Sequence, residues 1–360
     1  MARLTRAQQQ RRTRAAVLVA AGAEFAERGY AEAKIDRIAE RADLTRGAVY
    51  SNFTGKRALY LAVLADDAER ARDAAEAPAA SPATAGQALG AFARVWLERL
   101  PLSGDEPGSG RLRLRSLSGV LDTAPTRAAL AELVRFEALL LALALESRRA
   151  ARRRMVRPAE LALALLDGAA WRAENAPGTG DPFDLTRAAE HLADIALSDD
   201  EAAAHLPFVA PARTADDPWA PPRGLTDEIT GRAVDPAEDG VVVVLGVGRL
   251  SAAEDAVRSA APRDALTFVV VTDDAAEAGR LARLRVADLT GCLRRVFAAG
   301  ELPRPRVVFD EEGAVSSALG LPPGGDLTEA AVRVRAGVVV ARADGRGAGH
   351  AAAVSGTRTG

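Results

Sequence analysis

The sequence predicts a multidomain protein, with an all-α half that ends near residue 204 and an α/β module over residues 226–360. Apolar residues recur at helical spacing through most of the first 200 residues. From residue 241, short valine-rich runs alternate with helical patterns, as in a layered α/β domain. Residues 205–225 contain five prolines and no periodicity, so we expect an extended, partly flexible linker there.

Composition excludes several classes of protein and site. With 360 residues and 48% hydrophobic content, the chain is long enough to build the cores of two or three domains. A single cysteine excludes a disulfide framework, and three isolated histidines make a metal site improbable. The sequence has no apolar run long enough to cross a membrane, so we expect a soluble, cytoplasmic protein.

Within the predicted domain of residues 1–60, residues 35–60 have the pattern of two short helices separated by a tight turn. Residues 35–42 place their apolar side chains on one helical face. Asp43 breaks this pattern and belongs to a residue type that tolerates a left-handed turn. Thr45 is a good N-cap for a second helix, whose inward residues include Val49 and Phe53. This layout is typical of a helix-turn-helix that reads the major groove of DNA.

The charge distribution favours the same interpretation. Residues 1–60 contain 12 Lys and Arg against 6 Asp and Glu, a net charge of +6. The whole chain carries −2, which leaves −8 for the other 300 residues. A basic segment on an acidic body is typical of nucleic-acid-binding domains. Five arginines and no acid among the first 14 residues suggest a flexible basic arm along DNA.

The run from Thr13 to Leu64 resembles the N-terminal domain of the TetR family of transcriptional regulators. The resemblance lies in AGAEFAERGY (21–30), IDRIAERA (35–42) and LTRGAVYSNFTGKRALY (44–60), above all in the Tyr-x-x-Phe-x-x-Lys ending. It implies that Phe53 is core and that Tyr50 and Lys56 contact phosphates. The DNA-binding positions that we carry over are Lys34, Thr45, Arg46, Gly47, Ala48, Tyr50, Ser51, Asn52 and Lys56.

Two residues depart from the family pattern. Lys34 stands where the family usually has Ser or Thr, so the usual cap of the second helix is missing. A lysine there could still reach a phosphate as a point charge. Asp43 stands at a turn where the family favours Gly.

Residues 61–204 read as an all-α body, which the resemblance implies is a ligand-binding and dimerisation domain. Helical patterns fall near 84–100, 111–121, 126–154, 158–175 and 183–198. Four large aromatics could line an apolar ligand pocket or form ordinary core: Phe92, Trp96, Phe136 and Trp171. The last two helices would form the dimer interface, where the candidates, alternatively internal core, are Leu161, Leu165, Ala169, Leu192 and Ile195.

The module of residues 226–360 has a strand–helix order that ends in a hairpin. We expect strands at 241–245, 266–272 and 306–310, helices at 251–260, 281–297 and 314–319, and a hairpin at 330–342. Ser251 should cap the first of these helices, and Ala336-Gly337 should form the hairpin turn.

This order, with VVFDEEGAVSSALGL (307–321), resembles the thioredoxin fold and its peroxiredoxin-like members. In redox-active members a cysteine follows the first strand, but residues 246–253 contain none. The loop before the hairpin reads Leu327-Thr328-Glu329 where those members usually have a proline, and Cys292 lies inside the long helix. The resemblance therefore implies a module without catalytic residues or a cofactor. A rival interpretation, nucleotide binding at Gly246-Val247-Gly248, lacks the third glycine, because Ser251 stands there.

The sequence favours a TetR-like homodimer that binds a palindromic double-stranded operator and is released, as a repressor, by an unidentified small molecule. The alternative is a DNA-targeted redox or nucleotide-binding enzyme that acts through the C-terminal module.

Overall fold

The structure, a computed structural model, describes residues 5–100, 115–147, 154–197, 199, 203–322 and 324–355. The helices of the N-terminal half are α1 (Arg6–Glu32), α2 (Ile35–Arg41), α3 (Arg46–Tyr50), α4 (Lys56–Asp73), α5 (Ala85–Leu97), α7 (Ala124–Glu146), α8 (Val156–Asn175) and α9 (Pro182–Leu192). Thr84, Thr123 and Asp181 start α5, α7 and α9 by accepting a backbone N–H with their side chains. Of the helix predicted at 111–121, residues 111–114 lie outside the described residues and residues 115–121 are not helical.

The prediction of a flexible N-terminal arm is wrong for residues 6–14, which form the first turns of α1. Thr5 accepts a hydrogen bond from the Gln8 N–H, and the Gln8 side chain accepts one from the Thr5 N–H. This capping box starts the helix, and the Ala, Gln and Arg residues that follow are good helix formers. Residues 1–4 of the predicted arm lie outside the described residues.

The C-terminal half contains a six-stranded mixed sheet. Its strands are β1 (Arg213–Pro218), β2 (Gly240–Gly246), β3 (Ala265–Val271), β4 (Arg306–Phe309), β5 (Glu329–Arg335) and β6 (Val338–Asp344), in the order β1-β6-β5-β2-β3-β4. Strands β2, β3 and β4 are parallel, whereas β5, β6 and β1 join by antiparallel pairing. The helices are α10 (Ala253–Ser259), α11 (Ala278–Val296), α12 (Ala314–Ala318) and α13 (Ala348–Val354), and short 3-10 turns span 206–208, 250–252 and 299–301.

The predicted strands and hairpin are confirmed. Ala336 and Gly337 take φ angles of 47° and 73° between β5 and β6, the left-handed pair that a tight two-residue hairpin turn requires. The predicted Ser251 cap is wrong, because Ser251 lies in a 3-10 turn ahead of α10. Its backbone N–H donates instead to Glu132 Oε2 of α7, at 2.9 Å.

The linker prediction for residues 205–225 is also wrong in part. Residues 213–218 form β1, which pairs antiparallel with β6 at the edge of the sheet. An edge strand tolerates Pro218 because one side of its backbone needs no partner. Trp219 then packs against the sheet and donates from Nε1 to the Pro236 carbonyl at 2.9 Å.

The two faces of the sheet are covered differently. Val242 and Val244 of β2 belong to a small apolar cluster that contains Trp219 and residues of α12. Val241 and Val243 point to the other face, where residues of α10, α11 and α13 cover the sheet. The period-2 alternation of strand side chains produces this division.

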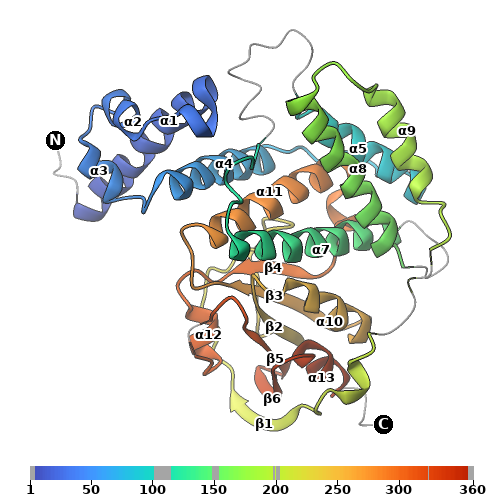
Figure 1. The fold of residues 1–360 in the computed structure, drawn as a ribbon. Helices are drawn as coiled ribbons and strands as arrows, with labels where there is room; N and C mark the ends of the chain where they lie inside the picture. The colour runs from blue at the N-terminus through green and yellow to red at the C-terminus, as the bar shows by residue number, and fades with distance from the viewer. Residues whose placement is uncertain are drawn as a thin grey trace.

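One continuous apolar core joins the helical half to the sheet. Figure 1 shows α11 lying between α4 and the sheet, with α7 beside it. The rings of Phe136 in α7 and Phe268 in β3 meet edge to face, with centroids 5.8 Å apart. The predicted domain boundaries at 204 and 226 stay predictions, but the described residues on both sides of them share this core.

Ion pairs accompany the apolar contacts of α11. Glu137 of α7 is buried and its Oε2 lies 2.6 Å from Arg285 Nη2 of α11. Because Glu137 is shielded from water, desolvation raises its pKa to about 7, although the guanidinium opposes that rise. Asp288 of α11 pairs with Arg99 at 3.2 Å and with Arg115 at 2.9 Å. Of the helices described, none has the length and apolar character that a membrane span needs.

Candidate nucleic-acid interface

The turn between α2 and α3 has the predicted local structure. Asp43 adopts a left-handed backbone with φ of 54°. Thr45 caps α3, because its Oγ1 accepts the Ala48 N–H at 3.2 Å. Both predictions are confirmed. The polar turn and its cap therefore fix the direction in which α3 leaves α2.

A buried carboxylate holds α2 against α1. Glu24 of α1 is fully buried, and Arg41 at the end of α2 lies 3.2 Å from its Oε2. Arg41 also pairs with Glu27 at 2.5 Å, and Arg28 lies 3.7 Å from Glu24 Oε1. Val49 and Phe53 complete the apolar centre of the domain, as predicted for both. These contacts fix the position of α3 and the direction in which its outward face points.

That outward face is polar and mostly exposed. Arg46, Gly47, Tyr50 and Ser51 are exposed, and Ala48 and Asn52 are half-buried. The Arg46 guanidinium lies 3.3 Å from Asp36 and 5.5 Å from the Tyr50 ring centroid. An added Cβ at Gly47 would meet only Thr45 Oγ1, at 3.8 Å, so nothing inside the protein requires glycine there. The physical reason that remains for glycine at position 47 is space for the backbone or a base of DNA to come close.

The two lysines of the predicted site differ in environment. Lys34 is exposed and makes no side-chain capping bond, as its departure from the family pattern predicts. Lys56 donates from Nζ to the carbonyls of Ala31 and Ala33 at 3.0 and 3.3 Å, and its Nζ lies 4.8 Å from the Tyr30 ring centroid. Nothing in the sequence around Lys56 indicates these contacts. A lysine ammonium has three N–H groups, so one of them is left for another acceptor.

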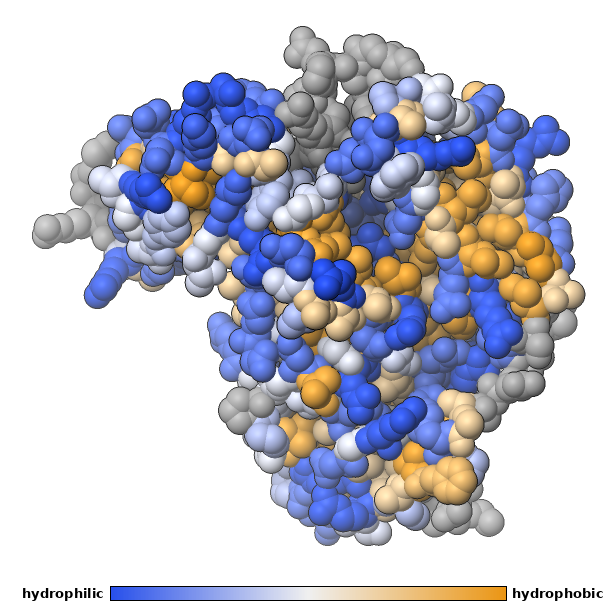
Figure 2. All heavy atoms as spheres, viewed as in Figure 1, coloured by the Kyte–Doolittle hydropathy of each residue, from blue (hydrophilic) through white to orange (hydrophobic). Residues whose placement is uncertain are grey.

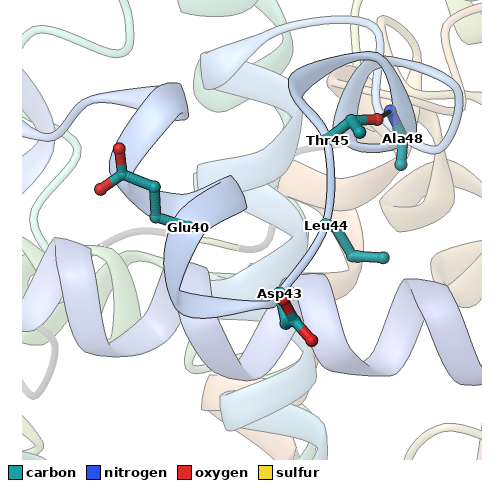
Figure 3. Close-up of a pocket in the computed structure, with 5 residues that line it drawn as sticks. All are labelled: Glu40, Asp43, Leu44, Thr45 and Ala48. Carbon is teal, nitrogen blue, oxygen red and sulfur yellow. Dashed lines mark hydrogen bonds between the residues drawn. The ribbon is translucent and has the colours of Figure 1, made fainter.

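A shallow hollow of about 440 Å³ lies at this turn. Figure 3 shows the five residues that line it. Thr45 and Ala48 lie together at the start of α3, joined by the capping hydrogen bond, and Glu40 points away from them. Leu44 and Asp43 complete the lining. Two carboxylates at the rim would repel phosphates, so the surface suited to DNA is the outward face of α3 and not the hollow.

The four aromatics predicted to line a ligand pocket differ in burial. Phe92 and Phe136 are fully buried in the continuous core, and Trp96 is nearly so. Trp171 is 64% exposed on α8. The prediction is corrected for Trp171, because a residue that lines an enclosed apolar cavity would be shielded from solvent. Phe136 packs on Phe268, which the sequence did not indicate.

In the α/β module, the segment that follows β2 makes backbone contacts with the loop before β5. The N–H of Gly246 donates to the Thr328 carbonyl at 2.8 Å and that of Gly248 to the Asp326 carbonyl at 2.9 Å. A Cβ at Gly246 would lie 2.3 Å from the Asp326 carbonyl oxygen, so this close approach requires the glycine. Cys292 is buried in α11, where desolvation raises the pKa of its thiol and disfavours the reactive thiolate.

Residues 17–63 match the family model of bacterial regulatory proteins, tetR family. This segment is a TetR-family helix-turn-helix domain. The match contains all of the predicted DNA-binding positions from Lys34 to Lys56. It covers the TetR-type α2–turn–α3 unit together with most of α1 and the start of α4.

Two TetR-family regulators are among the solved structures that are similar to the chain. A TetR transcriptional regulator from Rhodococcus sp. RHA1 is 19% identical, with 53% of this chain and 99% of that chain covered and a TM-score of 0.35. A TetR-family regulator from Pectobacterium atrosepticum is 26% identical, with 52% and 95% covered and a TM-score of 0.35. Because both scores lie below 0.5, we conclude nothing further from them. No curated protein matches the chain.

The left-handed turn at Asp43 leads to a testable prediction. Asp43→Ala should lower the free energy of unfolding by about 1 kcal/mol, because alanine pays more than aspartate for a positive φ. Asp43→Gly should leave it unchanged or raise it slightly. Denaturant unfolding of the two variants beside the parent protein measures both effects. Equal losses in the two variants would show that backbone strain at residue 43 is not the cause.

Proposed function

We propose that the protein is a cytoplasmic, TetR-type transcriptional regulator that binds DNA through the outward face of α3. The observation that carries the proposal is the exposure of Arg46, Tyr50 and Ser51 on a domain of net charge +6. Guanidinium and hydroxyl groups on a protruding helix suit base edges and phosphates in a major groove. The exposed pair of Arg46 with Asp36 is worth little in water, so DNA can replace it.

In this proposal each predicted residue has a place at the interface. Arg46, Gly47 and Ala48 stand at the start of α3, where it would enter the groove, with Ser51 and Asn52 at its end. Tyr50, Lys34 and the free N–H of Lys56 would meet phosphates. Thr45 serves through its cap on α3, which sets the angle of the helix.

We propose a homodimer that uses the outer faces of α8 and α9, to match a palindromic operator. Leu161 and Ile195 are exposed, and Leu165 and Leu192 are half-buried. Ile195 lies just beyond the end of α9, and two apolar side chains on the helices themselves, Trp171 and Phe183, are 64% and 76% exposed. Figure 2 shows hydrophobic side chains gathered over this part of the helical half. Ala169 is the one predicted interface residue that is buried within the chain.

We also propose that the C-terminal module is a thioredoxin-like domain without catalytic activity. Its parallel β2-α10-β3 unit, with β5 and β6 added antiparallel beside β2, supports this relationship. The backbone contacts of Gly246 and Gly248 support a structural use of the former cysteine position. A small molecule that favours one arrangement of the dimer would release the operator and relieve repression.

The DNA interface is tested by two substitutions with different expected signatures. Lys56→Ala should weaken operator binding and make the dependence on salt shallower by about one charge, because one phosphate contact is lost. Tyr50→Ala should weaken binding by about tenfold at an unchanged salt slope, because tyrosine is neutral. Fluorescence anisotropy over a salt series, on an operator selected from random DNA, measures both.

Arg213→Ala, an exposed arginine on β1, is the control and should change neither quantity. Parental affinity and slope in both test variants would sink the assigned contacts. Circular dichroism checks that loss of the Lys56 hydrogen bonds has not unfolded the domain.

The dimer surface is tested by a charge placed on it. Trp171→Glu should convert the dimer to monomers in sedimentation velocity, because a buried unpaired carboxylate is strongly unfavourable. Phe208→Glu is the matched control, since Phe208 is 88% exposed but lies outside α8 and α9. A Trp171→Glu protein that stays dimeric at micromolar concentration would contradict the proposed interface.

A further inference from the structure

Helix α4 is rigidly attached to the DNA-binding domain at its first turns. It begins at Lys56, with five residues between it and the end of α3, and Lys56 binds the carbonyls at the end of α1. The Tyr60 ring of α4 meets Phe25 edge to face at 4.9 Å and lies 5.0 Å from Tyr30. A change in the direction of α4 therefore carries α3 with it.

The C-terminal module holds α4 at both ends. At its N-terminal end, Arg57 Nε lies 2.6 Å from Glu277 Oε2, in the residue before α11. At its C-terminal end, Arg72 pairs with Glu228, and both side chains are largely buried. Arg283 of α11 reaches Glu69 at 3.4 Å. These partners are more than 150 residues apart in the sequence.

At the C-terminal end of α4, the backbone of α11 comes within van der Waals reach of the backbone of α4. A Cβ at Gly291 of α11 would lie 3.4 Å from Arg72 Cα. Arg294 extends from the next turn of α11 and donates to the Arg72 carbonyl at 3.4 Å and the Glu228 carbonyl at 3.2 Å. An added Cβ at Gly291 would make an ordinary van der Waals contact with Arg72, so alanine would fit there, whereas a larger side chain would press on α4.

Apolar side chains of α11 are buried in the interior of the helical half, beside those of α4. Leu281, Leu284 and Leu293 of α11 are buried in the same core as Leu61 and Leu64 of α4. Helix α11 also packs against α5 and α7. The core of the N-terminal helices α4, α5 and α7 therefore contains α11, which comes from the C-terminal half of the chain.

We propose that the α/β module positions the recognition helix: α11, with Glu228 and Glu277, clamps α4 and so sets the separation of the two α3 helices in the dimer. Glu228, Glu277 and Gly291 are positioning residues that touch no DNA. The inference rests on the proposed DNA-binding function and names the part of the chain that controls DNA binding. Signals that reach the α/β module act on DNA binding through α4.

A comparison of full operators with half-sites tests the clamp in the intact chain. The double variant Glu228→Gln/Glu277→Gln keeps the shape of both side chains but removes the charges that hold α4. We expect it to bind a full palindromic operator about tenfold more weakly and to discriminate less between half-site spacings. Its affinity for a single half-site should stay within twofold of the parent, because α3 and its contacts are unchanged.

Glu98→Gln is the matched control, since Glu98 pairs with Arg295 of α11 at 2.6 Å but lies at the end of α5, not on α4. It should bind both DNAs like the parent. Gly291→Leu is a second test variant, which should push α4 away and give the same selective loss. Thermal unfolding identifies any variant that is not folded, and the charge variant tests the clamp whatever Gly291→Leu does.

Three results separate the possible outcomes. Parental affinity and spacing preference in the double variant would overturn the clamp. Equal losses on full operators and half-sites would also overturn it, because they would indicate general damage to the domain. Failure of the parent protein to select any DNA would instead overturn the proposed function, and this inference with it.

Discussion

The structure depends on the burial of α11 on more than one side. An amphipathic helix at the surface of a protein buries a single stripe, with polar residues opposite. In α11 the buried residues include Leu281, Ala282, Leu284, Val286 and Ala287, which go around most of the helix. The helix belongs at once to the core over the sheet and to the core of the N-terminal helices. Removal of either layer would expose apolar surface to water.

Charged side chains on α11 complement this burial and give it direction. Asp288, Arg285 and Arg283 each find a partner of opposite charge in the helical half. A buried ion pair contributes little net stability, but a mismatched one is costly. Such pairs therefore select one register and one rotation of α11 among those that the apolar contacts allow. The same selection fixes α4, and with it the direction of α3.

Local features of the fold and site could be predicted because short-range chemistry decides them. The left-handed turn at Asp43, the Thr45 cap and the Ala336-Gly337 hairpin each depend on a few adjacent residues. Contacts distant in sequence were missed. β1 forms because β6 offers an unpaired edge, and Lys56 turns to carbonyls that its neighbours do not reveal.

The second buried side of α11 did have a signal in the sequence. Gly279, Ala282 and Gly291 are small residues off the leucine stripe, as expected where a second helix or sheet comes close. Whether a given side chain is exposed is harder to infer from the sequence, since a tryptophan at helical spacing suits a core as well as an interface. The polar face of α3 could be predicted, but the element that holds it in place could not.

The most direct test of the shared core is a double-mutant cycle across it. Phe136→Leu and Phe268→Leu, singly and together, remove the ring contact between α7 and β3 but keep most of the buried volume. Denaturant unfolding of the full chain should show a coupling free energy of about 0.5–1.5 kcal/mol, as expected for an edge-to-face pair. Additive losses, with separate unfolding transitions for the two halves, would contradict a core shared between the helical half and the sheet.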